Sequence, residues 1–199
     1  SDCRPSQPDA SRAFIVVVLV LCTLIAVLRV VRLEVPGTIY FDEHHYVNAA
    51  RDYLQGIEDR NFSHPPLAKL FIAESIELFG DRPAVWRIPS CICGVASMFL
   101  GGAMAWRLTG LLIGLDFLSH VQSRIATLDA LTAFWIYLAL LFGAINLTRQ
   151  RPTFMLDLAT GLSLGVANGC KWSGAFAAAA LVGGHIWMSG DWRRCLRVS

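Results

Sequence analysis

The chain has 199 residues, of which 55% are hydrophobic and 16% are charged, and its formal net charge is +2. A soluble domain carries about 25% charged residues, so this composition argues against an ordinary soluble protein. The charges collect in short clusters. The uncharged runs between them reach roughly 15 to 20 residues, the length that a helix needs to cross the membrane hydrocarbon. The composition therefore predicts an all-α integral membrane protein with several spans and gives no reason to expect a nucleic-acid partner.

The six cysteines do not indicate a disulfide framework or a metal site. Cys22, Cys91, Cys93 and Cys170 lie in or beside apolar runs. The spacing of Cys91 and Cys93 does not match a zinc knuckle, and no second pair accompanies them. We expect small buried thiols.

Residues 1–13 are polar and contain prolines, which predicts a disordered cytoplasmic tail. Residues 14–199 are expected to form a single membrane domain of five or six spans. The first span ends in Arg29 and Arg32 rather than a cleavage site, so we expect it to be retained, with both arginines extending to the interface. The third predicted span is too short to cross as a straight helix. The predicted spans are residues 14–33, 88–106, 111–120, 130–147, 156–170 and 172–190.

The arginines and lysines of the short loops predict how these spans are oriented. With a cytoplasmic N-terminus, every short inside connection is basic, whereas the short outside connections carry only Arg124 and Lys171. Three polar segments then lie on the external side: the long loop 34–87, the segment 122–129 and the turn around Lys171. We expect the chemistry of the protein in these segments.

The long external loop contains two predicted helices. Asp42 is a favourable N-cap, Glu43 suits a first helical turn, and Gly56 can end that helix. The second helix is predicted to follow residues 64–66 (HPP) and to stop at Gly80. Both have apolar residues at helical spacing, which predicts amphipathic helices on the membrane surface. These residues are Tyr46, Ala49, Ala50, Tyr53 and Leu54 in the first helix and Leu67, Leu70, Phe71, Leu78 and Phe79 in the second.

The adjacent carboxylates Asp42 and Glu43 have three interpretations. They can serve the helix alone, as a cap and a residue that complements its dipole. One of them can instead be a general base that takes a proton from an attacking hydroxyl. The third interpretation is a metal site shared with His44, His45 and His64. The spacing of these histidines matches no ligand motif, so we predict no metal.

Arg124, Asp129 and Lys171 lie beside or within apolar runs, where a charge is costly and faces a partner or a polar cavity. In a structural interpretation, Arg124 pairs with Asp129, and Lys171 extends to the interface beside the belt residue Trp172. The alternative is an anion site, since Arg offers a planar fork and Lys a compact charge to a phosphate. Beside the carboxylates, these cations would stabilise a lipid-phosphate leaving group.

Four segments, taken together, resemble the protein O-mannosyltransferases, and the bacterial branch most closely. Their order and spacing resemble the N-terminal part of that family. Asp-Glu after a first span and His-Pro-Pro-Leu also occur in related lipid-sugar transferases, so the four segments together carry the specificity. They are residues 41–46 (FDEHHY), 64–70 (HPPLAKL), 122–129 (QSRIATLD) and 170–174 (CKWSG).

The resemblance implies a helical bundle of the membrane glycosyltransferase class C type. It implies inverting transfer of mannose from polyprenyl-phosphate mannose to Ser or Thr hydroxyls of exported proteins, without a metal or other cofactor. It makes Asp42 the base and Glu43 its motif partner, and it assigns the donor phosphate to Arg124 and Lys171. The candidates for the substrate cavity are His64, Asp129 and Trp172.

Three alternatives stay open. A related transferase would move another sugar from a polyprenyl phosphate to a lipid or a glycan. A transporter or channel subunit would use Arg124, Asp129 and Lys171 as intramembrane polar sites, but it predicts inverted repeats, and the chain shows no clear self-similarity. The third alternative is an inactive fragment, because the family domain continues through more spans than this chain holds.

The expected location is the cell membrane, with the N-terminus cytoplasmic and the active site on the external face, or the lumenal face of the endoplasmic reticulum in a eukaryote. Membrane lipids are expected neighbours. The sequence leaves the oligomeric state open.

Overall fold

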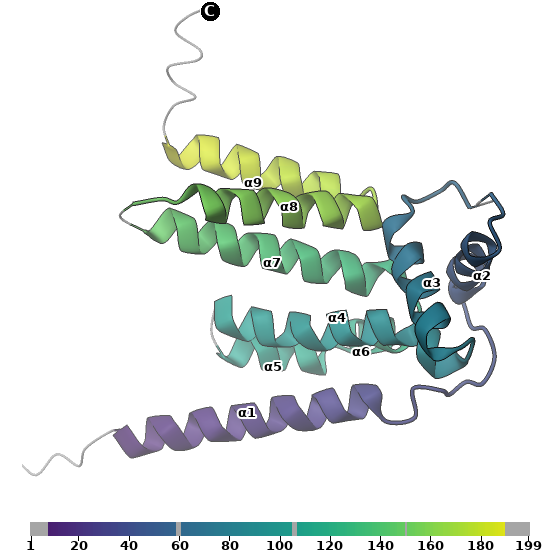
Figure 1. The fold of residues 1–199 in the computed structure, drawn as a ribbon. Coiled ribbons are helices and arrows are strands. Elements are labelled where there is room, and N and C mark those ends of the chain that lie inside the picture. The colour runs from purple at the N-terminus through teal and green to yellow at the C-terminus, as the bar shows by residue number, and fades with distance from the viewer. Residues whose placement is uncertain (1–7, 59–60, 105–106, 150, 190–199) are drawn as a thin grey trace, which may run out of the picture.

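The computed structural model describes residues 8–58, 61–104, 107–149 and 151–189. Within these ranges every regular element is a helix (Figure 1), which confirms the predicted all-α fold. The helices are α1 (Pro8–Val30), α2 (Glu43–Leu54), α3 (Leu67–Phe79), α4 (Pro83–Met104), α5 (Arg107–Leu115), α6 (Phe117–Arg124), α7 (Leu128–Thr148), α8 (Phe154–Cys170) and α9 (Gly174–Ser189).

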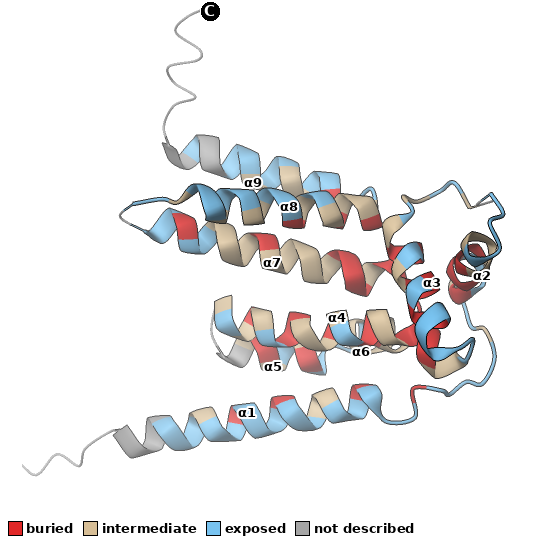
Figure 2. Ribbon diagram, viewed as in Figure 1, coloured by how far each residue is buried: buried red, intermediate tan, exposed pale blue. Residues whose placement is uncertain are grey.

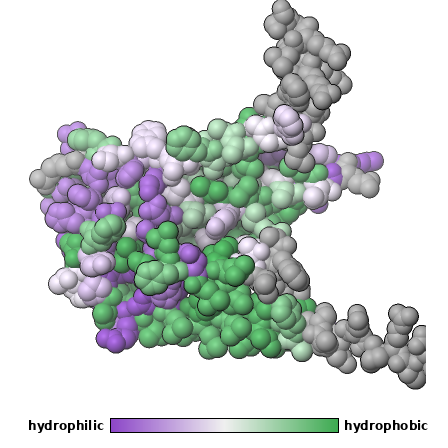
Figure 3. Space-filling model, turned by 180° about the vertical axis from the view of Figure 1, so that it is seen from behind, coloured by the Kyte–Doolittle hydropathy of each residue, from purple (hydrophilic) through white to green (hydrophobic). Residues whose placement is uncertain are grey.

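Helices α1, α4, α7, α8 and α9 run side by side, and α2 and α3 lie across one end of them (Figure 1). Among the described residues, three helical stretches are long and apolar enough to cross a membrane, fewer than the five or six spans predicted. Hydrophilic residues gather at the end formed by α2 and α3, and hydrophobic residues cover the flanks of the long helices (Figure 3). The chain is therefore a membrane protein with one polar end. The three stretches are Arg12–Val30, Pro83–Met104 and Leu128–Thr148; Phe154–Cys170 and Gly174–Gly184 are apolar but shorter.

Two long helices begin earlier than predicted, each at a proline. Helix α1 starts at Pro8, so residues 8–13 of the predicted tail are helical, while residues 1–7 lie outside the described ranges. Helix α4 starts at Pro83 rather than residue 88. Proline is favourable at a first helical position because its missing N–H has no partner to lose there.

The predicted third span is not one helix but two, α5 and α6, separated at Asp116. The Asp116 backbone is extended, and its side chain accepts a hydrogen bond from the Ser119 N–H at 2.6 Å. An aspartate in this conformation caps the helix that follows instead of continuing the one before it. The prediction of one short segment at 111–120 is therefore wrong, because two helices cover residues 107–115 and 117–124.

The buried face of α3 differs from the predicted apolar stripe. Ile72 and Ile76 are buried beside small residues, whereas Leu70, Leu78 and Phe79 are exposed. Buried residues concentrate where α2 and α3 meet the ends of α4 and α7, while most of α1 is exposed (Figure 2). Small residues on the inner face of α3 let its backbone approach its neighbours, which leaves the larger apolar side chains directed outward.

Arg29 does not extend to the interface as predicted, because it is fully buried. Its guanidinium donates to the Gly94 carbonyl at 3.1 Å and to the Ser119 Oγ at 3.0 Å, and it also bonds to backbone carbonyls of α5. A Cβ on Gly94 would lie 2.3 Å from the Ser123 Cβ. A glycine is therefore needed where α4 meets α6, and Arg29 fastens α1 to that junction.

Candidate active site

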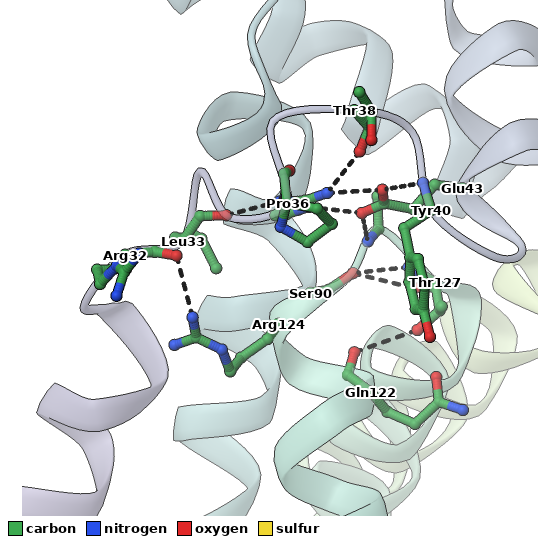
Figure 4. Close-up of polar contacts among 12 residues, drawn as sticks. Arg32, Leu33, Pro36, Thr38, Tyr40, Glu43, Ser90, Gln122, Arg124 and Thr127 are labelled. Atoms are coloured by element: carbon green, nitrogen blue, oxygen red, sulfur yellow. Dashed lines mark hydrogen bonds and ion pairs between the residues drawn. The ribbon is translucent and has the colours of Figure 1, made fainter.

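Glu43, in the first turn of α2, is fully buried. Its carboxylate accepts hydrogen bonds from the Arg87 Nε at 2.6 Å and the Arg87 Nη2 at 2.8 Å. The backbone N–H groups of Tyr40 and Ala126 also donate to it, each at 2.9 Å. Figure 4 shows Glu43 among these contacts. One carboxylate therefore joins α2 to α4 and to the connection between α6 and α7.

Arg87 supplies the opposite charge from the beginning of α4 and is also fully buried. Its Nη1 donates to the carbonyls of Leu33 and Pro36, both at 2.9 Å, and its Nη2 donates to the carbonyl of Thr38 at 3.2 Å. Arg87 is not among the site residues predicted from the sequence, although an arginine beside an apolar run indicates a buried partner. Together, Arg87 and Glu43 fix the loop that leads into α2.

Asp42 occupies the N-cap position of α2, as predicted, but its side chain makes no cap hydrogen bond. Its backbone is already helical, with φ −65° and ψ −12°, whereas a capping residue is extended and turns its side chain onto the first N–H groups. The predicted capping role of this side chain is wrong. Within the described ranges nothing bonds to this half-buried carboxylate, which is therefore available to a ligand.

Arg124, the last residue of α6, donates to four backbone carbonyls around the C-terminal end of α1. The last carbonyls of a helix have no partner within it, and a cation there also complements the helix dipole. Figure 4 shows the Arg124 side chain reaching toward Arg32. The four bonds are 2.7 Å to Leu28, 3.0 Å to Arg29, 2.8 Å to Val31 and 3.0 Å to Arg32.

Asp129 pairs with Lys171, not with Arg124 as one interpretation predicted, and the Lys171 Nζ lies 2.5 Å from the Asp129 Oδ1. Asp129 is in the first turn of α7 and Lys171 directly follows α8. The two side chains remain 44% and 25% exposed, respectively, so a ligand can reach them. A Cβ on Gly174 would lie 2.5 Å from a backbone nitrogen of α8, and the turn after Lys171 therefore needs its glycine. Trp172, which directly follows Lys171 in the sequence, is exposed.

His64 and Tyr46 lie close to these charges. Their ring centroids are 6.3 Å apart, and the buried His64 Nδ1 has no hydrogen-bond partner within the described ranges. Burial lowers the pKa of His64, and the charge of Lys171 acts in the same direction. Burial, followed by the charges of Asp42 and Asp129, raises the pKa of Tyr46 to about 12. The structure thus brings four predicted residues, Asp42, His64, Asp129 and Lys171, together with Tyr46, whose position in the sequence predicts only an apolar helix face.

Helices long and apolar enough to cross a membrane, with two carboxylates, a lysine and a histidine clustered at one end of them, define a membrane protein with a polar cluster at that end. The chain matches two sequence profiles described as dolichyl-phosphate-mannose–protein mannosyltransferase, one over residues 19–91 and the other over residues 63–199. The chain belongs to this family of membrane glycosyltransferases.

Curated relatives named polyprenol-phosphate-mannose–protein mannosyltransferase are similar to most of the chain. The relative from Mycolicibacterium smegmatis is 33% identical, and the matched region covers 79% of this chain and 38% of the relative. The relative from Mycobacterium tuberculosis is 28% identical, and the matched region covers 84% of this chain and 40% of the relative. The relative from Corynebacterium glutamicum is 31% identical, and the matched region covers 70% of this chain and 35% of the relative. The chain therefore spans less than half the length of these relatives.

Proposed function

We propose that the intact protein transfers mannose from a polyprenyl-phosphate-mannose donor to serine or threonine hydroxyls of exported proteins. The shared name of the relatives supports this donor and a protein acceptor. The basic inside loops support a cytoplasmic N-terminus and a site on the external face of the cell membrane, or on the lumenal face of the endoplasmic reticulum in a eukaryote. Lipids would surround the exposed apolar flanks of the long helices.

The observation that carries this proposal is the unpaired carboxylate of Asp42 in a cluster that also holds a lysine. In the proposed reaction, Asp42 takes the proton of the acceptor hydroxyl. The hydroxyl oxygen bonds to the anomeric carbon of mannose, while the bond from that carbon to the phosphate oxygen breaks. Polyprenyl phosphate leaves with the bonding electrons, and the anomeric configuration inverts.

We assign Glu43 a positioning role next to this base. Both of its oxygens already accept hydrogen bonds from Arg87 and from backbone N–H groups. These four hydrogen bonds occupy the four lone-pair sites that a carboxylate offers, so Glu43 has no oxygen left to contact an acceptor hydroxyl. Glu43 therefore serves the reaction by holding the backbone of Asp42 rigidly.

Lys171 is the proposed ligand of the donor phosphate. The phosphate would compete with Asp129 for the Lys171 ammonium, and that charge would stabilise the leaving group as negative charge develops. For Arg124 we propose a supporting role at the same phosphate, through its charge and by holding α1 against α6, since four carbonyls occupy its guanidinium. We propose that the unpaired His64 Nδ1 and the exposed Trp172 border the substrate cavity.

The test is transfer of radiolabelled mannose from polyprenyl-phosphate mannose to a serine- and threonine-containing peptide, in membranes that carry the intact protein. The Asp42→Asn variant should insert normally and lose transfer, and the exposed carboxylate change Glu77→Gln on α3 is the matched control. If the Asp42→Asn variant transferred mannose at the wild-type rate, Asp42 would not be the base. If the wild-type protein transferred the radiolabelled mannose only to a lipid or a glycan, the protein would be a transferase with a different acceptor.

A further inference from the structure

A cavity of about 420 Å³ lies between α4, the α5–α6 segment and α7. Its walls are mainly apolar, but Asp116, Ser119, Gln122, Asp129 and Tyr137 also line it. Its volume falls within the range of about 300 to 1,000 Å³ that is usual for small-molecule sites. Neither Asp42 nor Lys171 lines this cavity.

Gln122 gives the cavity an unmet demand for a hydrogen-bond donor. Its Oε1 is buried and has no partner within the described ranges. Figure 4 shows its amide directed away from the network of Glu43 and Arg124, so neither satisfies it. Leaving a buried acceptor unpaired is costly, and such an atom is expected to have a partner in the working protein.

Asp129 connects this cavity to the cluster of charges at the proposed active site. Its Oδ1 is bonded to the Lys171 Nζ, and within the described ranges its Oδ2 has no hydrogen bond. The same residue lines the cavity. A ligand in the cavity that can donate a hydrogen bond to Asp129 therefore lies next to the ammonium that we propose for the donor phosphate.

The polar groups also indicate the class of ligand. The amide oxygen of Gln122 and the carboxylates of Asp116 and Asp129 can accept hydrogen bonds from several hydroxyl groups. Tyr137 adds an aromatic ring to the cavity wall. An isoprenoid tail has no donors and would leave the Gln122 oxygen unpaired. A hexose joined to a phosphate offers hydroxyl groups at a fixed short distance from that phosphate, which fits a cavity adjoining Lys171.

We propose that this cavity binds the hexose of the lipid-linked donor and reads its hydroxyl groups through Gln122 and Asp129. This assignment rests on the proposed function and adds the residues that recognise the sugar. Lys171 then binds the phosphate, and the anomeric carbon lies between the phosphate and the carboxylate of Asp42.

The test measures binding of two ligands, polyprenyl-phosphate mannose and polyprenyl phosphate, to the purified intact protein in lipid nanodiscs. The Gln122→Met variant keeps the length of the side chain and removes its acceptor. We expect affinity for the mannosyl donor to fall roughly tenfold, the usual scale for one lost hydrogen bond, and affinity for polyprenyl phosphate to stay unchanged. Gln55→Met, which changes an exposed amide at the C-cap of α2, is the control and should change neither affinity.

Unchanged polyprenyl phosphate binding also shows that the variant is folded. If the Gln122→Met variant does not accumulate, Gln122→Asn is the second variant, because its side chain is one methylene shorter and moves the amide oxygen away from the ligand. It should also lose affinity for the mannosyl donor and keep its affinity for polyprenyl phosphate. Equal losses for both ligands, or no loss for either, would overturn the assignment. Because the readout is binding, absence of mannose transfer by the wild type would refute the proposed function without deciding this assignment.

Discussion

Glu43 and Arg87 form a bidentate ion pair, with N–O distances of 2.6 and 2.8 Å and both side chains fully buried. The pair joins the beginning of α2 to the beginning of α4, and its remaining bonds hold the loop ahead of α2 and the connection ahead of α7. Asp42 follows that loop and Asp129 follows that connection. Two aspartates of the candidate site, far apart in sequence, are therefore positioned by one pair of opposite charges.

Replacing Glu43 with Ala should destabilise the protein by about 3 to 5 kcal/mol, because Arg87 would be left charged and unpaired in a buried position. The measurement is thermal unfolding of the intact protein in detergent. The control is Asp81→Ala, which breaks the half-exposed pair with Arg51 and should cost only about 0 to 1 kcal/mol. Equal effects of the two variants would contradict the anchoring role of Glu43.

Replacing Arg124 with Ala should lower stability by about 1 to 3 kcal/mol, because carbonyls at the end of α1 lose their donor. Replacement with Lys separates the two roles discussed above. A lysine can bind a phosphate as a point charge but cannot reach four carbonyls with a planar fork. We expect Arg124→Lys to recover little of the lost stability, measured by thermal unfolding. Normal stability in Arg124→Ala together with a raised KM for the donor would instead indicate direct phosphate contact.

Replacing Lys171 with Ala should raise the KM for polyprenyl-phosphate mannose at least about tenfold, because a charge-assisted contact to the phosphate is lost. Stability should change little, since the Asp129 that it leaves unpaired is 44% exposed. Arg151→Ala serves as the control, because it removes an exposed cation that precedes the N-terminal end of α8. An unchanged donor KM in Lys171→Ala would exclude the proposed phosphate site.

His64 should make the protein less stable in mild acid. Burial and Lys171 lower its pKa in the folded state, so between that value and about 6.5 the unfolded chain binds more protons than the folded one. The stability from a neutral His64 is complete above about pH 6.5 and is lost as the pH falls through the folded-state pKa. Thermal unfolding measured from about pH 7.5 to about pH 5 should show a shallower loss in His64→Gln than in the wild type, and no such change in the exposed control His45→Gln. Identical slopes in all three proteins would refute the role of His64.

Much of the secondary structure followed from short-range patterns. Apolar runs predicted the long helices, and Gly80, with a φ of 89°, ended α3 where expected. These signals act within a few residues of one another, because capping, turn formation and helical periodicity are local. The break at Asp116 was missed, since the apolar residues on either side of it read as one run.

The sequence by itself determined the membrane class, the helical fold and the family, and it selected Asp42, His64, Asp129 and Lys171. Only the tertiary structure decided which charge meets which. Glu43 meets Arg87 across 44 positions and Asp129 meets Lys171 across 42, while Arg124 bonds to carbonyls more than 90 positions away. A charged group near membrane depth requires a partner, and the sequence shows that requirement. The identity of the partner depends on which helix ends pack together, which no local pattern specifies.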